Sequence, residues 1–247
     1  DVSPEAFVEK EPVTVVCSKK GWIRALKGHV QDTSDIKHRQ GDEGRFSINA
    51  YTTDKLLVIS PNGRVYTLGV DKLPGGRSQG EPLGLLLNWD PGAPPPVDIV
   101  PHRSPDQRWI IASNIGRGFV IQEKEMVAQT RNGRQVMNLN DSEQVLRFRP
   151  LSEGDDHVAV IGENRKLLLF PLDQLPEMSR GRGVLLQRYR DGGLSDIKAF
   201  KLGEGLTWQR GPQTRCEKDI LPWLGNRAQS GRLPPSGFSR TNKFTDF

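Results

Sequence analysis

The feature that most constrains the fold of this chain is a repeat of hairpin-like segments. Each copy has an apolar run, a short polar turn and a second apolar run, a pattern typical of two antiparallel strands. Four copies are clear and the fifth is degraded. They are "VTVVCSKKGWIRAL" (13–26), "LLVISPNGRVYTL" (56–68), "WIIASNIGRGFVI" (109–121), "HVAVIGENRKLLLF" (157–170) and "LTWQRGPQTRCEK" (206–218).

The turns of these copies set the length of the repeat. Asn-Gly is the strongest short hairpin signal because both residues tolerate positive φ. Successive turns follow at roughly 40 to 50 residues, the size of one four-stranded propeller blade. The residues aligned at the turns are Lys20-Gly21, Asn62-Gly63, Ile115-Gly116, Asn164-Arg165 and Gln213.

A second landmark, a Gly/Arg loop, recurs between the hairpins. In three repeats a Leu-Pro pair precedes it, and an apolar segment follows several of the copies. The repeated unit is therefore a hairpin, a loop and further strands. The Gly/Arg landmarks are Gly44-Arg45, Gly80-Glu81, Gly133-Arg134, Gly181-Arg182 and Gly231-Arg232.

The repeat predicts an all-β, propeller-like domain of about five four-stranded blades. One unit cannot cover both faces of its own sheet, so the units are expected to pack radially around one core. The 26 glycines and 18 prolines agree with many turns. Two unrelated β-sandwiches would explain the strands but not the paired landmarks. We expect a linker at 1–12, blades at roughly 13–55, 56–108, 109–156, 157–204 and 205–235, and a flexible tail at 236–247.

The sequence contains no recognisable catalytic motif. Four scattered histidines lack metal-ligand spacing, and the carboxylate pairs Asp42-Glu43 and Asp155-Asp156 lie in turn-like segments. The three tyrosines fall in strand-like runs, where packing is a sufficient explanation. Cys17 and Cys216 are expected to be free thiols of a cytosolic protein. We expect no membrane span and no signal peptide, and the absence of an initial methionine suggests a piece of a longer chain.

Positive charges recur at the two landmarks. The chain has 35 Lys and Arg against 30 Asp and Glu, so the excess matters only if it is focused on one face. Radial packing would set equivalent loops around a rim, which suits the phosphates of duplex DNA better than base-specific readout. The candidate DNA-binding residues in the hairpins and the Gly/Arg loops are Lys19, Lys20, Arg24, Arg45, Arg64, Arg77, Arg117, Arg131, Arg134, Arg165, Lys166, Arg180, Arg182, Arg227 and Arg232.

With the repeats aligned, the chain resembles the C-terminal domains of a family formed by the A subunits of bacterial gyrase and topoisomerase IV. The resemblance rests on "SKKGWIRALKGH" (18–29), "LPGGRSQGEPL" (73–83), "ASNIGRGFV" (112–120) and "LLLFPLDQLPEMSRGRG" (167–183). It implies a β-pinwheel, in which neighbouring blades exchange strands and duplex DNA binds around the outer rim. The ring is either closed or open.

The first repeat assigns the resemblance to the topoisomerase IV branch. Where gyrase carries a basic, glycine-rich box, this chain has "KHRQGDEGR" (37–45), with Asp42 and Glu43 at positions where positive charge is expected. Lys37 and Arg39 of this stretch are further DNA-binding candidates. The departure implies DNA bending rather than complete wrapping.

The resemblance also implies partners and a setting. The partners are duplex DNA, the N-terminal catalytic region of the same polypeptide and the B subunit of topoisomerase IV in an A2B2 enzyme, with a monomeric C-terminal domain. The parent enzyme would use a tyrosine, ATP and magnesium that all lie outside this chain, so no cofactor and no catalysis are expected here. The setting is the bacterial cytoplasm and nucleoid, with peripheral membrane association left open.

Two other functions stay open at this point. A propeller-like scaffold could use the arginine loops to dock acidic proteins and have no role in DNA binding. A single-strand binder would interleave stacking aromatics with basic residues. Trp22, Tyr66, Phe119 and Phe170 instead follow the hairpin turns, so we expect most of them in the core.

Overall fold

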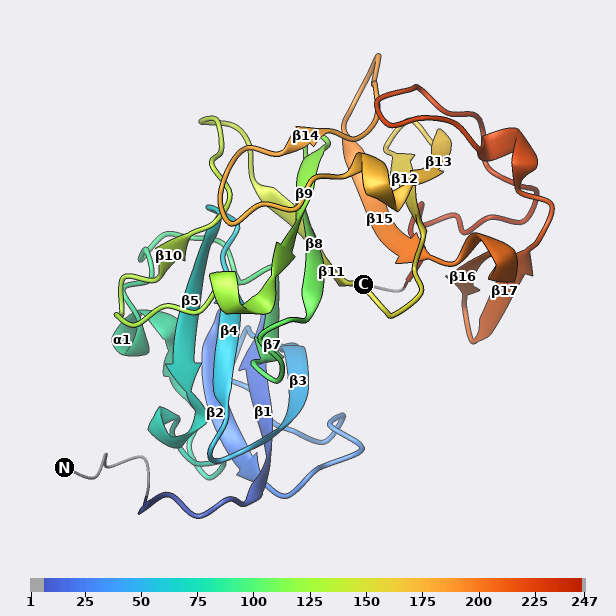
Figure 1. Cartoon of the computed structure of the whole chain (residues 1–247). Coiled ribbons are helices and arrows are strands. Elements are labelled where there is room, and N and C mark those ends of the chain that lie inside the picture. Colours follow the sequence, from blue (N-terminus) through green and yellow to red (C-terminus); the bar gives the residue numbers. More distant parts are fainter. Residues whose placement is uncertain (1–6, 246–247) are drawn as a thin grey trace. The chain divides into compact units, whose positions relative to one another are not determined.

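The computed structural model describes residues 7–245, and its regular secondary structure consists mainly of short β-strands (Figure 1). The chain forms two compact units. The first comprises residues up to Pro105 together with Met126–Val136, and the second comprises Asp106–Glu125 and Met137 onward. No helix among the described residues is long and apolar enough to cross a lipid bilayer.

The first unit holds two four-stranded antiparallel sheets around one apolar cluster that includes Val15, Ile23, Leu56 and Tyr66. The first sheet has the order β3 (Gly44–Tyr51), β1 (Pro12–Ser18), β2 (Trp22–Lys27) and β6 (Glu81–Pro82). The second has the order β10 (Arg134–Gln135), β5 (Arg64–Gly69), β4 (Lys55–Ile59) and β7 (Asp98–Pro101). The short helices are η2 (Val70–Lys72) and α1 (Leu83–Leu86).

The second unit holds three sheets of decreasing size. The third has the order β11 (Val145–Pro150), β8 (Arg108–Ser113), β9 (Arg117–Gln122) and β14 (Val184–Leu185). The fourth has the order β13 (Leu167–Pro171), β12 (His157–Gly162) and β15 (Leu194–Phe200), and the fifth pairs β16 (Leu206–Arg210) with β17 (Gln213–Glu217). The short helices are η3 (Glu123–Glu125), η4 (Leu172–Gln174), η5 (Leu202–Glu204) and η6 (Leu221–Trp223).

The five predicted hairpins are confirmed, and four of them share one turn. In each of these a backbone N–H donates to the carbonyl three residues earlier, as from Gly63 to Ser60 (3.0 Å). The donor has positive φ, 84° to 88° at Gly21, Gly63 and Gly116. Arg165 adopts the same conformation with φ 68° although it is not a glycine. The fifth hairpin turns instead at Gly211-Pro212, before the aligned Gln213.

A later segment of the chain completes each of the first four sheets. The two-residue strands β6, β10 and β14, which we call donated strands, follow the next hairpin in sequence yet pair with β2, β5 and β9 of the preceding sheet. In the fourth sheet a single bridge between Leu167 and Arg232 has this position. This is the strand exchange expected of a β-pinwheel.

The structure corrects two of the five Gly/Arg landmarks. Gly44 opens β3, which pairs with β1 of its own sheet, so Gly44-Arg45 does not begin a donated strand. In the third sheet β14 begins after Gly183, so the equivalent position lies two residues beyond the predicted Gly181.

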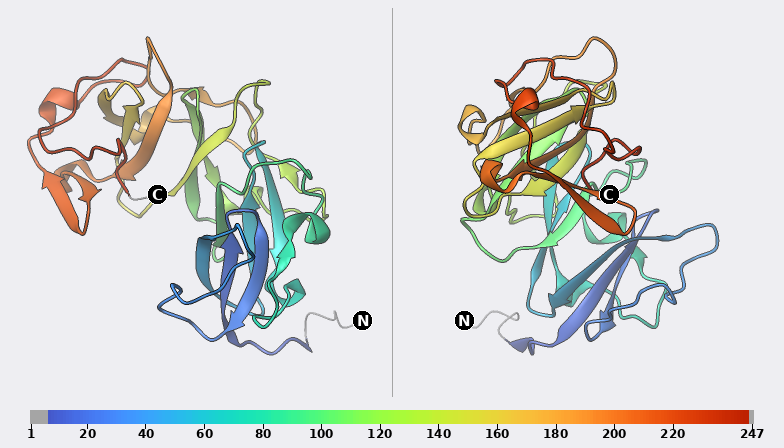
Figure 2. Two further views of the ribbon diagram at one scale, coloured as in Figure 1. Left: turned by 180° about the vertical axis from the view of Figure 1, so that it is seen from behind. Right: turned by 90° about the vertical axis from the view of Figure 1, so that its right-hand side faces the viewer.

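The described part of the expected tail packs against the rest of the second unit. Phe238 and Phe244 are buried in the cluster that includes Leu206 and Trp208. The carbonyl of Phe244 accepts a hydrogen bond from the N–H of Gln209 (2.8 Å), on the outer edge of β16. The C-terminal segment, residues 235–245, therefore covers one side of the fifth sheet (Figure 2). Residues 246–247, and 1–6 of the expected linker, lie outside the described residues.

The all-β, propeller-like fold class is confirmed, with four strands in each of the first three sheets and fewer in the last two. The blade boundaries remain a prediction.

Candidate nucleic-acid interface

The loop before each donated strand is fastened at both ends to the same strand. In the third sheet the N–H of Val120 on β9 donates to the carbonyl of Pro176 (2.9 Å), and Met178 donates back to Val120 (2.8 Å). The chain then leaves the sheet and returns as β14 beside Arg117 and Gly118. The intervening residues 179–182 therefore form an outward loop, which we call an arginine loop.

The first and fourth sheets fasten their loops similarly. The N–H of Ala25 donates to the carbonyl of Pro74 (2.9 Å) before the chain returns at Glu81. In the fourth sheet Gly225 donates to Leu169 (2.8 Å) before the bridge at Arg232. The Leu-Pro pair of the sequence thus marks the first attachment in the first and third sheets. The arginine loops of these sheets are 75–79, 179–182 and 226–230, and residues 130–132 precede the donated strand of the second.

A glycine sits where each arginine loop returns to its sheet. A Cβ on Gly183 would lie 2.5 Å from the carbonyl oxygen of Gly118, and one on Gly231 would lie 2.5 Å from that of Leu167. Both glycines have positive φ, so a larger residue meets a steric and a conformational obstacle. We call these positions crossing glycines: Gly80, Gly133, Gly183 and Gly231. These glycines recur because the returning chain passes close to the backbone of the sheet, so their recurrence is not evidence of a phosphate-binding site.

Some predicted cations fasten the loops from within. Arg117 on β9 donates to the carbonyl of Gly183 (3.0 Å). Arg64, at the same position of β5, donates to the carbonyl of Asn132 (Nε, 2.9 Å). Arg227 donates to the carbonyl of Leu185 (2.8 Å). These guanidiniums are partly buried and bind backbone carbonyls in or beside the donated strands, so we assign them a structural role.

Two more candidates also point inward. Arg24 is only 7% exposed and donates to the carbonyl of Ser78 (2.6 Å), so its guanidinium is not available at the surface. Arg165 donates to the carbonyl of Ser239 (2.9 Å) and thereby fastens the C-terminal segment. Lys166 is half-buried beside it.

The other predicted cations are exposed. In the third sheet the exposed Arg180 donates to the side chain of Asn138 (3.2 Å). Arg182, whose side chain is 47% exposed, lies 3.9 Å from the buried carboxylate of Glu143. Guanidinium and ammonium groups so placed can bind phosphate oxygens. The exposed candidates are Lys19, Lys20, Lys37, Arg39, Arg45, Arg77, Arg131, Arg134, Arg180, Arg182 and Arg232.

In the first repeat, the acidic residues neutralise part of this charge. Glu43 forms an ion pair with Lys19, and the carboxylate of Asp42 accepts the backbone N–H of Lys20 (3.1 Å). Asp42 and Glu43 therefore sit directly against the lysine pair of the first hairpin turn. Arg39 stacks over the ring of Trp22 at 3.8 Å.

The aromatic residues mostly lie in the core, as expected. Phe119 and Phe170 are fully buried and Tyr66 is 2% exposed. Tyr189 packs against the turns at Gly116 and Gly162. Burial raises the pKa of its hydroxyl above the usual range, and the negative charge of Glu163 raises it further. Tyr66 and Tyr189 are thus explained by packing rather than by stacking on bases or by nucleophilic chemistry.

Sequence reasoning missed two exposed arginines, Arg188 and Arg190, which flank the partly buried Tyr189. The backbone N–H of Arg188 donates to the carbonyl of Gln229 (3.0 Å), so this segment lies against the fourth arginine loop. The alternation Arg-Tyr-Arg was the available signal, because the two cations are exposed and the ring between them packs against the core.

The chemistry of the remaining polar groups is structural. Among residues 7–245, no three His, Cys, Asp or Glu side chains gather as metal ligands. Both cysteines are free. Burial, and secondarily the charge of Asp42, raises the pKa of Cys17 to about 12, so that its thiol stays protonated at neutral pH.

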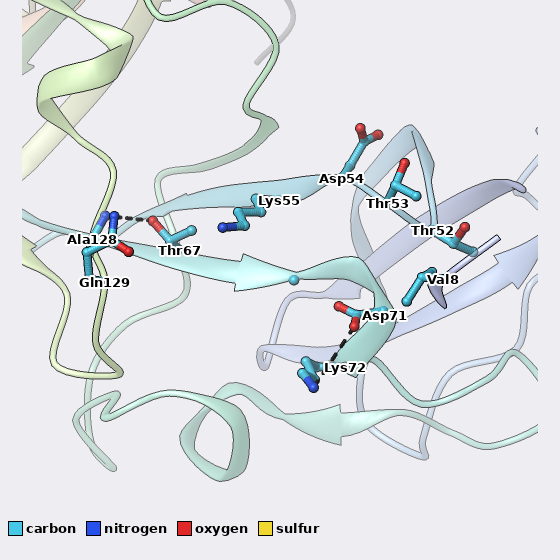
Figure 3. A pocket seen from close by; sticks show the side chains of 11 residues that line it. Val8, Thr52, Thr53, Asp54, Lys55, Thr67, Asp71, Lys72, Ala128 and Gln129 are labelled. Atoms are coloured by element: carbon cyan, nitrogen blue, oxygen red, sulfur yellow. Dashed lines mark hydrogen bonds and ion pairs between the residues drawn. The ribbon is translucent and has the colours of Figure 1, made fainter. Parts of the chain in front are cut away.

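A polar pocket of about 250 Å³ lies in the first unit at the end of β4 and β5 away from their turn (Figure 3). Lys55, Asp54 and Thr67 line it, Asp71 and Lys72 approach each other at 4.0 Å, and Thr67 accepts the N–H of Ala128 (2.8 Å). Its charges are balanced, and none of the candidate DNA-binding residues lines it.

Three comparisons with known proteins agree on one family. The model of the DNA gyrase C-terminal domain, described as a beta-propeller, matches residues 54–83, 107–152 and 156–194, which include the second, third and fourth hairpins. The first and fifth hairpins lie outside the matched segments.

Among curated relatives, the A subunit of DNA topoisomerase 4 from Rickettsia bellii is 45% identical over 240 residues, which cover 97% of this chain. The homologue from Caulobacter vibrioides is 40% identical over 245 residues. The chain spans about a third of each relative's length, 32%. The solved C-terminal domain of ParC from E. coli superposes with a TM-score of 0.79 at 28% identity, over 93% of this chain and 96% of that one.

Proposed function

The chain belongs to the family of C-terminal domains found in the A subunits of DNA gyrase and topoisomerase IV, and from this premise we propose that it binds and bends duplex DNA without catalysing a reaction. The observation that carries the proposal is the arginine loop. It recurs between sheets, both ends are fastened, and its exposed side chains include Arg77, Arg180 and Arg182.

Fastened loops suit phosphate binding because little conformational entropy remains to be lost when the DNA binds. Guanidiniums neutralise phosphates and release counterions, and contacts on several loops would favour a curved duplex over one base sequence. The ion pair between Lys19 and Glu43 in the first repeat supports bending rather than complete wrapping.

At the level of the whole enzyme, we propose that this domain serves the A subunit of topoisomerase IV. It would present the transported DNA segment to the N-terminal catalytic region during supercoil relaxation and decatenation in chromosome segregation. The B subunit, ATP and magnesium would be bound elsewhere in the A2B2 enzyme, at the nucleoid. The relatives do not favour a protein-interaction scaffold without a role in DNA binding.

The test is a charge reversal in one loop, measured by fluorescence anisotropy on a labelled duplex. In R180E/R182E the log–log salt dependence should become less steep by about two, since each lost phosphate contact removes ~0.9 from the slope. The matched control is R210E/R240E, which reverses two exposed arginines outside the arginine loops. Salt-insensitive binding by the unaltered chain, or equal losses in both variants, would contradict the proposal.

The preference for bent DNA has its own test. Relaxed, positively supercoiled and negatively supercoiled circles compete for the chain in an electrophoretic assay. We expect supercoiled circles, whose duplex is already bent, to bind more tightly than relaxed ones. Equal retention of all three would refute bending while leaving phosphate binding intact.

A further inference from the structure

The outer edge of β17 lacks a strand partner in the described part of the chain. Arg210 pairs with Gln213 across the two-residue turn. Hydrogen-bonded and non-hydrogen-bonded pairs alternate in an antiparallel ladder, so the N–H and C=O groups of Thr214 and Cys216 point away from β16. Residues 213–216 are all exposed, and both views of Figure 2 show no strand beside β17.

The opposite edge of the fifth sheet is covered. The N–H of Gln209 donates to Phe244 (2.8 Å), and the ammonium of Lys198 donates to the carbonyl of Thr207 (2.5 Å). The backbone N–H of Gln209 and the backbone carbonyl of Thr207 both point away from β17. Growth of this sheet is therefore possible only along β17. An uncovered edge of this kind is a ready template for another strand.

We propose that β17 pairs antiparallel with β17 of a second copy of this chain, with Cys216 opposite the second copy's Cys216. This register joins the outward N–H and C=O groups of the two residues. The next outward pair would be Thr214 with Lys218 of the second copy. The result is a sheet of four strands, the number found in the first three sheets.

Charge complementarity selects the second copy and the register. Arg215 would lie opposite Glu217 of the second copy, and the symmetry produces this pair twice. Opposite charges directly across an antiparallel pair are favourable, whereas like charges are not. A register centred on Arg215 would instead place two arginines face to face, and one centred on Glu217 would oppose two carboxylates.

Sedimentation of the chain without DNA tests the association. We expect a concentration-dependent dimer between about 10 and about 500 μM, because an interface this small supports only weak affinity. R215E and E217R each create two like-charge pairs and should weaken dimerisation at least about fivefold. The double swap R215E/E217R restores complementarity and should recover it. Thermal unfolding of each variant shows whether the fold is kept.

A thiol cross-link tests the register. A short bismaleimide should join two copies through Cys216, which is exposed, and not through Cys17, which is buried. C216S should abolish the product, and R215E should reduce it. A chain that stays monomeric throughout the concentration range, or a dimer unaffected by both single swaps, would overturn the proposal.

Discussion

The third and fifth sheets are completed in different ways. In the third sheet β14 returns from beyond the next hairpin, and its approach creates the arginine loop with Arg180 and Arg182. The fifth sheet receives no donated strand within the described residues. Two other groups cover β16 instead: Phe244 of the C-terminal segment accepts the N–H of Gln209, and Lys198 of β15 donates to the carbonyl of Thr207. An arginine loop therefore forms where a later segment of the chain returns to complete an earlier sheet.

The largest loss of stability is expected from a substitution in the C-terminal segment. Phe244 is 1% exposed, so F244A removes a buried ring and should lower the free energy of unfolding by about 3–5 kcal/mol in chemical denaturation. F7A, at a phenylalanine that is 77% exposed, is the matched control and should change it by less than ~0.5 kcal/mol. Equal effects would show that the C-terminal segment does not stabilise the fifth sheet.

The next largest loss of stability is expected at Gly183, the crossing glycine of the third sheet. G183A should cost about 2–4 kcal/mol, since its Cβ meets the Gly118 carbonyl and its φ is 76°. G203A is the control, because no atom lies near the Cβ position of Gly203. Denaturant unfolding measures both, and a tolerated G183A would mean that β14 can return by another path.

Arg117 and Arg180 should differ in what their loss affects: stability for the first and DNA binding for the second. R117A removes the bond to the Gly183 carbonyl and should cost about 1–2 kcal/mol of stability. R180A should leave stability within ~0.5 kcal/mol and lower duplex affinity. If the two substitutions gave the same stability loss, the division of the cations into structural and DNA-facing groups would be wrong.

The smallest expected effect is a pH dependence of stability that arises from Lys198, on β15 of the fourth sheet. Burial lowers the pKa of Lys198 from 10.5 to about 8, against the opposing effect of Asp196. Between these values the unfolded chain holds a proton that the folded chain has released, so stability rises with pH there. Below about 8 both states are charged and the cost of burying the ammonium is present in full.

K198M should remove this dependence. Unfolding of both proteins from pH 7 to pH 10.5 gives the difference in stability, and the advantage of K198M should shrink by on the order of 1 kcal/mol once solvent screening is allowed for. A constant difference over this range would mean that Lys198 titrates like an exposed lysine.

Much of the fold could be predicted from the sequence because the hairpins are local. Two apolar runs around a turn near Gly63 or Gly116 suffice to place both strands. The donated strands have only two residues each, too few for an alternating pattern. The C-terminal segment was missed because Phe238 and Phe244 are isolated in a polar stretch, and their burial depends on β16, distant in sequence.

The candidate site was predictable as a set of cations but not as a surface. Arg117 and Arg182 look alike in sequence, yet one binds a carbonyl 66 residues away and the other faces solvent. Whether an arginine binds a carbonyl or faces solvent depends on where the chain returns to the sheet. No local sequence pattern encodes this path. The neutralisation of Lys19 by Glu43 likewise depends on the loop folding back over the first turn.

Strand donation also imposes an order on biosynthesis. The first sheet cannot receive β6 until the β4–β5 hairpin has been made, and the third waits in the same way for β14. A chain growing from its N-terminus therefore always carries one incomplete sheet, whose open edge can capture a neighbouring nascent chain. Each donated strand closes that edge when it pairs with the preceding sheet.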